Sequence, residues 1–263
     1  MLGAEQLGDL ELLNIQAELF VDDHGRIADV CGITIGNAPD GQALWIGADV
    51  PEVLASELTR IVESAQIATN PTEPPPALEH CERLLEATLG GRMARHAGPS
   101  YVFGTVKRFS SGAHIERSDA SSGEGLHDAN PGNWGSTEWE ELLEGRLGPW
   151  AMAIAGGKVL SICHTPLPLI DRAAECGVWT HPDARGRGHA AAVTAEWARI
   201  VQPTRRHLFY STDANNLSSQ RVAQRLNLRP LGWTWRIARE EQNSGARVHP
   251  LSNERVRRGS RSL

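Results

Sequence analysis

The sequence has 263 residues, enough for one large domain or two modest ones. A hydrophobic fraction of 40%, a charged fraction of 22% and a formal net charge of -6 describe an ordinary globular chain. They exclude electrostatic attraction of the whole protein to nucleic acid or to an anionic membrane, so we expect neither as a partner. Any site for an anion must therefore be local.

The four cysteines are spread along the chain without a Cys-x-x-Cys pair, at Cys31, Cys81, Cys163 and Cys176. This spacing predicts neither a zinc site nor a disulfide framework, so we expect no metal and reduced thiols. No run approaches the ~18 apolar residues of a membrane span, and the N-terminus lacks the basic and apolar regions of a secretion signal. These features predict a cytoplasmic location.

The first third predicts a strand, a turn, a strand and then helices. Residues 17–32 place Asp23-His24-Gly25 between apolar runs, which is a hairpin signal. Residues 48–65 have Pro51 near a predicted helix start, and the proline cluster of residues 69–80 cannot continue that helix. A second helical pattern over 78–95 leads to a strand signal at Tyr101–Phe103.

The remainder is more regular after a loop rich in Gly, Ser, Asp and Asn. We predict, in chain order, a short strand at 114–116, a helix in 137–148, a hairpin in 150–165 that turns at Gly156-Gly157, a strand in 174–180, a helix in 189–201, a strand in 206–212, a helix in 216–227 and a strand in 231–239. The basic tail 241–263 has little apolar content, so we expect it to be disordered.

The turn before the helix at 189–201 reads Arg185-Gly186-Arg187-Gly188. A helix N-terminus carries unpaired backbone N–H groups and the positive end of the helix dipole. Glycines let a ligand approach the backbone closely, and the two arginines add formal charge. These features together predict a phosphate cradle, whereas a plain strand-to-helix turn with solvated arginines is the simpler alternative.

Two other phosphate motifs match poorly. The glycines satisfy the dinucleotide fingerprint G-x-G-x-x-A formally, but the residue about 20 positions later is Arg206 rather than an acid. Gly157-Lys158 is followed by Val159, which has no hydroxyl for a metal, so a Walker A motif is absent.

The pattern R-x-x-G-x-A from Arg185 to Ala190 resembles the pyrophosphate-binding signature of the GCN5-related N-acetyltransferase (GNAT) superfamily. Residues 216–228 resemble the N-x-x-S-x-x-V-A-x-x-L-G-F helix of that family, with Asn227-Leu228 in place of Gly-Phe. The resemblance covers roughly residues 100 to 240. It implies an α/β (α+β) fold of the GNAT type, a mixed central sheet flanked by helices, and the N-terminal third resembles the extra segment of uncharacterised bacterial members.

The resemblance further implies acetyl-CoA as the cosubstrate. Its pantetheine is expected along the backbone of Val178, Trp179 and Thr180. Its pyrophosphate is expected on Arg185, Gly186, Arg187, Gly188, His189 and Ala190, and its tail beside Asn216 and Ser219.

Acetyl transfer to an amine also needs a proton acceptor and a group that protonates the leaving thiolate. Glu175 on the predicted strand and His164 on its neighbour are the candidate bases, and each has a structural alternative. The helix-borne tyrosine of many relatives is missing here, so Tyr210 is the candidate acid beside direct proton loss through water. Cys163 and Cys176 read as core thiols.

From these residues and the resemblance we expect an N-acetyltransferase that modifies a primary amine on a small molecule such as a metabolite, amino acid or antibiotic. Protein or peptide N-acetylation and a non-catalytic acyl-CoA-binding module remain alternatives. The predicted segments are an N-terminal α/β region over 1–98, a GNAT domain over 99–240 and the tail 241–263. The N-terminal region could complete the acceptor pocket, mediate a homodimer or form a degenerate second copy of the fold.

Overall fold

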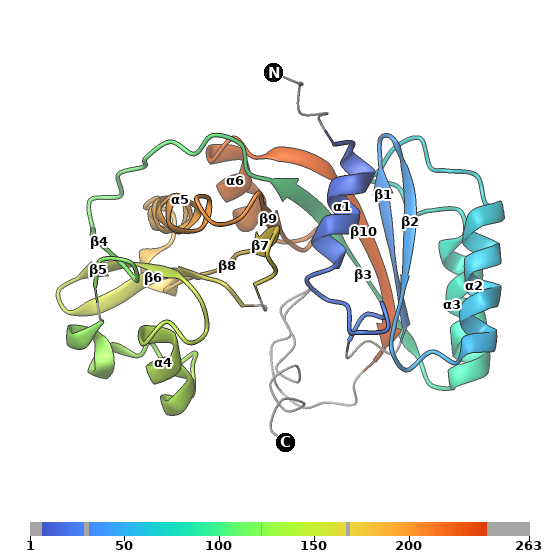
Figure 1. The fold of residues 1–263 in the computed structure, drawn as a ribbon, viewed down its shortest axis with the longest axis horizontal. Coiled ribbons are helices and arrows are strands. Elements are labelled where there is room, and N and C mark those ends of the chain that lie inside the picture. Colours follow the sequence, from blue (N-terminus) through green and yellow to red (C-terminus); the bar gives the residue numbers. More distant parts are fainter. Residues whose placement is uncertain (1–6, 29–31, 122, 167–168, 241–263) are drawn as a thin grey trace. The chain divides into compact units, whose positions relative to one another are not determined.

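The structure is a computed structural model that describes residues 7–28, 32–121, 123–166 and 169–240. Its contacts divide the chain into two units, and Figure 1 traces their elements. The first unit comprises Met1–Ser100, Ser211–Asn216 and Pro230–Leu263, and the second comprises Tyr101–Tyr210 and Leu217–Arg229. This division differs from the predicted linear segments because the last strand pairs with the first one. The predicted tail 241–263 lies outside the described residues.

The first unit combines a small antiparallel sheet with helices. Its helices are α1 (Asp9–Ala17), α2 (Glu52–Ser64) and α3 (Leu78–Leu89), and its strands are β1 (Gly32–Ala38), β2 (Gly41–Ile46), most of β3 (Met93–Val102) and most of β10 (Arg229–Arg239). The strands follow one another in the order β2, β1, β10, β3. Strand β10 thereby brings the C-terminal part of the described chain beside β1, in an antiparallel register from Gly32↔Ala238 to Asn37↔Trp233.

Several N-terminal elements differ from the prediction. Helix α1 was not predicted, because it is short and buries the polar Gln16 together with its apolar residues, which weakens the helical periodicity even though Glu11 and Asn14 are exposed. The predicted hairpin at Asp23–Gly25 is a turn closed by a single bridge, Val21↔Ile27. The extended hairpin is instead β1–β2. Strand β3 begins at Met93, before the predicted Tyr101.

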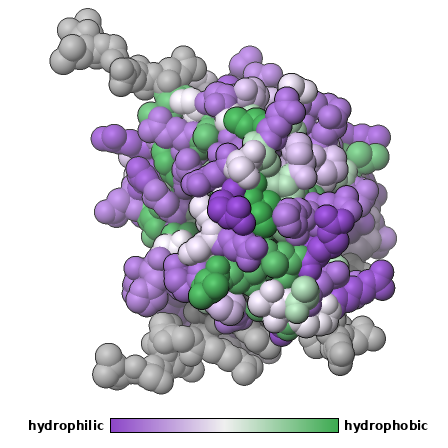
Figure 2. All heavy atoms as spheres, turned by 90° about the vertical axis from the view of Figure 1, so that its right-hand side faces the viewer, coloured by the Kyte–Doolittle hydropathy of each residue, from purple (hydrophilic) through white to green (hydrophobic). Residues whose placement is uncertain are grey.

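Helices α2 and α3 lie next to each other and cover one face of this sheet (Figure 1). Ile33 and Ile35 of β1 and Ile237 of β10 point to the same face and pack with Leu58 and Leu85 in one buried cluster. Helix α2 begins after Pro51, as predicted. The outer side of these helices mixes hydrophilic and hydrophobic residues (Figure 2), as expected for a solvent-facing surface.

The second unit carries the predicted order of elements. They are β4 (His114–Arg117), η1 (Glu124–Ala129), α4 (Ser136–Leu143), β5 (Trp150–Ala155), β6 (Lys158–His164), β7 (Ala173–Glu175), β8 (Gly177–Thr180), η2 (Pro182–Ala184), α5 (His189–Val201), most of β9 (His207–Ser211) and α6 (Leu217–Arg225). Strands β4, β5, β6 and β8 form an antiparallel sheet in that order. Strands β7 and β9 pair in parallel, so the unit mixes both pairings, as the α/β fold class requires.

Both faces of the four-stranded sheet are covered. Ala151, Ala153 and Cys163 pack on one face with α5, whose buried residues include Val193 and Trp197. Trp150, Met152 and Ile162 alternate to the other face, where they pack with α4. The predicted turn at Gly156-Gly157 joins β5 to β6, with both glycines at positive φ. A rigid sheet thus holds the chain that leads to the Arg-Gly-Arg-Gly turn.

Within the described ranges, no helix is long and apolar enough to cross a membrane. Nor do three His, Cys, Asp or Glu side chains of the described residues gather closely enough to hold a metal ion.

Candidate active site

The predicted strand 174–180 is split into two short strands at Cys176. Upstream of the split, β7 pairs in parallel with β9, and the Cys176 N–H donates to Phe209 O at 3.2 Å. Downstream, β8 pairs with β6 in the antiparallel sheet. β8 is the last strand of that sheet, so one of its edges carries no partner strand among the described residues. The main chain of Val178 and Thr180 can therefore bond an extended ligand at this edge, whereas that of Trp179 faces Ile162 of β6.

The turn between β8 and α5 has the backbone that the sequence predicted. Gly186 and Gly188 have φ of +77° and +86°, a left-handed conformation that side chains other than glycine rarely adopt. A Cβ atom at Gly186 would meet nothing within 4 Å. The backbone here is thus bare on its outer side, which leaves room for a bound group.

Helix α5 begins directly after this turn, and no side chain caps its N-terminus. Its first backbone N–H groups are therefore left for a ligand, and the helix dipole favours a negative one. Arg185 and Arg187 are exposed on the turn, and the Arg185 Nε–H donates a long 3.5 Å bond to Thr180 O. This arrangement of bare backbone, helix terminus and arginines fits a pyrophosphate.

His189 and Ala190 open the helix, but they contribute differently from the arginines. The His189 side chain is buried, and burial together with the nearby Arg187 charge lowers its pKa. A buried neutral imidazole adds no charge to the turn. His189 therefore adds no charge to the predicted phosphate site, and its backbone N–H is one of the donors at the helix start.

A third arginine, which the sequence motif did not identify, lies at this turn. The Nη1 atom of Arg225, at the end of α6, is 2.9 Å from where a Cβ of Gly188 would be. The guanidinium thus rests against the backbone of Gly188. The motif spacing of α6 carries no signal for this contact, which depends on how α6 packs against α5.

We predict that Arg225→Gln weakens acetyl-CoA binding about tenfold, because one charge-assisted contact to phosphate is lost. Arg221→Gln on the same helix is the matched control, since Arg221 is exposed and equally charged. Calorimetry at low and high salt should show a smaller salt dependence for Arg225→Gln alone. Equal affinities for the two variants would contradict a role for Arg225.

His164 lies over the start of β8. Its Nδ1–H donates to Gly177 O at 3.2 Å, and its Cε1 is 3.1 Å from where a Cβ of Gly177 would be. Because a carbonyl only accepts, the Nδ1 atom carries the proton, and Nε2 is the ring nitrogen able to accept one. Trp134 meets the ring edge-on at a centroid distance of 5.8 Å. The predicted base is thus oriented beside the strand split.

Glu175 and Tyr210 are deeper. Glu175 ends β7 opposite Phe209 of β9 and is 3% exposed. Tyr210 is equally buried, and its hydroxyl lies 2.6 Å from Ser219 Oγ, which ties β9 to α6. Burial raises the pKa of Tyr210, so its phenol keeps its proton at neutral pH.

Asn216 and Ser219, which are predicted to lie beside the CoA tail, belong to different units of the structure. Ser219 belongs to the second unit and contacts Tyr210. Asn216 belongs to the first unit, where its N–H donates to Asp213 O at 3.0 Å. Their joint role beside the cosubstrate stays a prediction.

The described cysteines, Cys81, Cys163 and Cys176, are buried and free. Burial and the adjacent Cys163 raise the pKa of Cys176 well above its usual value, and burial raises that of Cys81 to about 11. The thiolate is the reactive form, so neither side chain is set up as a nucleophile.

We predict that Cys81 in a Cys31→Ser variant reacts with a disulfide reagent at least about a hundredfold more slowly than a free thiol at pH 8, because its thiolate fraction falls by that factor. The reaction should reach normal speed in denaturant. Fast modification of the folded protein would contradict the burial of these thiols.

Comparison with known proteins matches part of this chain to a known family. The family model of the acetyltransferase (GNAT) domain matches residues 105–229. Among solved structures, a protein from Novosphingobium aromaticivorans assigned to the GNAT family is 18% identical, with 90% of this chain and 100% of that chain covered and a TM-score of 0.47.

A GCN5-related N-acetyltransferase from Kribbella flavida is 14% identical over 91% of this chain and 98% of its own, with a TM-score of 0.47. An acetyltransferase of the GNAT family from Colwellia psychrerythraea is 13% identical over 90% and 98%, with a TM-score of 0.45. A search of curated proteins finds no match. Residues 105–229 therefore match a GNAT acetyltransferase domain.

Proposed function

We propose that the protein transfers an acetyl group from acetyl-CoA to a primary amine of a small molecule. The observation that carries this proposal is the turn before α5, where left-handed Gly186 and Gly188 alternate with exposed arginines at an uncapped helix N-terminus. A net-negative chain concentrates positive charge there. Such a turn suits the pyrophosphate of a CoA thioester.

The residues around the strand split suit the rest of that molecule. The unpartnered edge of β8 offers backbone N–H and C=O groups of Val178 and Thr180 to an extended pantetheine. Backbone donors at the split would stabilise negative charge on the thioester oxygen during attack. Acetyl-CoA supplies the activated acyl group, and the chain binds and orients it.

The transfer requires that the amine be neutral when it attacks the thioester carbon. The new C–N bond forms as the C–S bond breaks, the amine proton passes to a base, and the CoA thiolate takes up a proton. We assign the base to His164, because its Nδ1–H is held by Gly177 O and its Nε2 has the lone pair. Glu175 is the alternative base, and the protonated Tyr210 or water is the proton donor.

The test is release of free CoA thiol from acetyl-CoA over a panel of small amines, aminoglycosides and short peptides, with calorimetric CoA binding in parallel. Release that depends on a small amine, with a mass increase of one acetyl group on that amine, is the expected result. Release with peptides alone would replace the small-molecule acceptor by a protein. Tight CoA binding without release for any acceptor would favour a non-catalytic module.

A further inference from the structure

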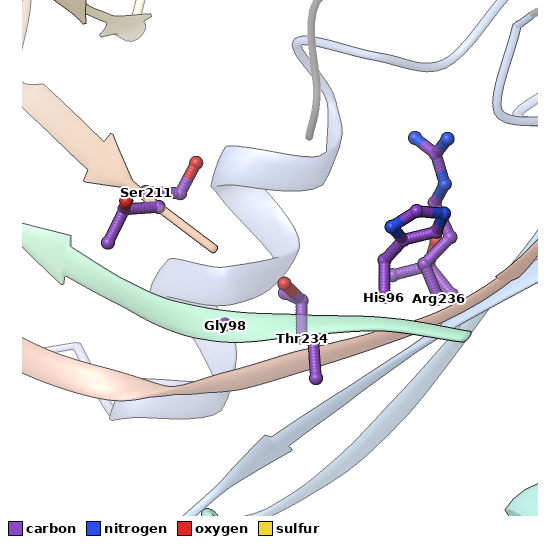
Figure 3. Close-up of a pocket in the computed structure, with 8 residues that line it drawn as sticks. His96, Gly98, Ser211, Thr234 and Arg236 are labelled. Carbon is purple, nitrogen blue, oxygen red and sulfur yellow. The ribbon is translucent and has the colours of Figure 1, made fainter. Parts of the chain in front are cut away.

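A small, partly open hollow lies in the first unit, on strands that the acetyl-transfer proposal does not use. Figure 3 shows its side chains around the translucent sheet. Its lining residues are Thr34 of β1, Thr234 and Arg236 of β10, His96, Ala97 and Gly98 of β3, and Ser211 and Thr212 at the end of β9.

The strand register explains why these residues meet on one face. Thr34 is directly opposite Arg236 in the β1–β10 pair, and Thr234 is two residues from Arg236 on the same side. The alternating residues Ile33 and Ile35 point to the opposite face, where α2 and α3 pack. One face of this sheet is thus an apolar core. The other carries Thr34, Thr234 and Arg236 beside α1, whose Leu13 lies against Gly36.

The groups in the hollow are mainly hydrogen-bond donors. Figure 3 shows the His96 and Arg236 side chains next to each other on the same side of the sheet. Burial and the Arg236 charge lower the pKa of His96, whereas Asp213 acts in the opposite direction. Arg236 and Asp213 are therefore the charged groups that act on this imidazole.

Ser100 adds a buried polar group on this side of β3. It is fully buried, and its Oγ has no hydrogen-bond partner among the described residues. The alternation of β3 puts Ser100 on the same face as His96 and Gly98. A buried hydroxyl without a protein partner is rare in native proteins, and a ligand or water that reaches this face of β3 would satisfy it.

We propose that this hollow binds a small oxyanion, the carboxylate or phosphate group of a ligand, between the Arg236 guanidinium, the His96 imidazole and the hydroxyls of Thr34 and Thr234. A guanidinium and hydroxyl donors match the lone pairs of such an oxyanion. The hollow is too small for a whole CoA molecule, and it lies on the first unit alone. The proposal is independent of acetyl transfer.

The experiment follows the C2–H resonance of His96 by NMR in the full chain, assigned with His96→Gln. Sodium phosphate and sodium acetate are added separately at constant ionic strength set with sodium chloride. We expect a saturable shift with at least one of them and a higher His96 pKa in its presence, because a bound anion favours the imidazolium. Tighter phosphate binding would indicate a phosphate ligand, and tighter acetate binding a carboxylate.

Two variants test the lining. Arg236→Gln should weaken the apparent affinity about tenfold or more, and Thr234→Val should weaken it several-fold while keeping the shape of the side chain. Arg60→Gln is the matched control, because Arg60 is exposed on α2, which packs on the opposite face of the sheet. It removes the same charge and should leave the affinity unchanged.

The readout is the resonance of His96, and the lining variants distinguish an anion bound in the hollow from one bound at the turn before α5. Absence of saturation with both anions would overturn the proposal. A saturable shift that Thr234→Val leaves unchanged, or that Arg60→Gln weakens as much as Arg236→Gln, would also overturn it. Thr234→Val keeps the test valid if Arg236→Gln fails to fold.

Discussion

Gly186→Leu is expected to weaken acetyl-CoA binding at least a hundredfold, a loss of roughly 3 kcal/mol. The Cβ of Gly186 would project into open space at the turn, where we place the pyrophosphate, so a larger side chain would occupy the site without a clash in the free protein. The left-handed φ adds strain of about 1–2 kcal/mol that lowers stability as well. Calorimetric titration with acetyl-CoA measures the effect.

Gly157→Leu separates these two contributions. Gly157 has a similar φ of +71° and nothing within 4 Å of a Cβ, but it lies in the β5–β6 turn rather than beside α5. The two variants should lose similar thermal stability, and only Gly186→Leu should lose affinity. Normal binding by Gly186→Leu, or equal losses in both variants, would remove the phosphate cradle from the mechanism.

His164→Gln is expected to lower kcat about a hundredfold and to leave acetyl-CoA affinity unchanged, because general-base catalysis contributes at least that factor. Glutamine keeps a donor for Gly177 O but cannot accept a proton at neutral pH. The rise of wild-type rate between about pH 5 and 8 that a histidine base produces should disappear in the variant. Steady-state kinetics with the acceptor identified above measures both effects.

Glu175→Gln is the matched comparison, since it removes the alternative base with little change in shape. If His164 is the base, Glu175→Gln should keep the pH dependence of the wild type. A hundredfold loss in Glu175→Gln with normal rates in His164→Gln would transfer the role to the carboxylate. Normal rates in both variants would leave proton removal to water.

The second unit was predictable because its elements depend on local patterns. Helix α5 occupies the predicted residues 189–201, and the glycine pair at 156–157 produces the β5–β6 hairpin. The first unit was harder. Helix α1 buries the polar Gln16 with its apolar residues, which weakens its periodicity, and β3 starts in a segment whose histidine, glycine and proline residues are poor strand signals. The pairing of β10 with β1 joins distant segments, and no spacing reveals such a partner.

In the candidate site, too, the local features were predictable from the sequence and the long-range contacts were not. The conformation of a turn depends on consecutive residues, so the sequence motif was enough to locate Gly186, Gly188 and the arginines beside them. In the structure both glycines have the left-handed backbone. Contacts between residues of different elements could not be predicted from the sequence. Arg225 reaches Gly188 from another helix, and the Gly177 carbonyl fixes the tautomer of His164 from a neighbouring strand. The spacing of residues along the sequence predicts neither contact.

The β1–β10 pairing has a consequence for the order in which the protein is made. Residues Gly32 and Ala238 are partners in this register, but about two hundred residues separate them along the chain. At ribosomal rates of about 5–20 residues per second, β1 waits on the order of 10–40 s for its neighbour. Tyr101–Tyr210, by contrast, is one continuous stretch of the second unit. In the nascent chain, the continuous stretch of the second unit can therefore fold before β1 finds its partner. The exposed edge of β1 is the surface that chaperones must protect until β10 has been synthesised.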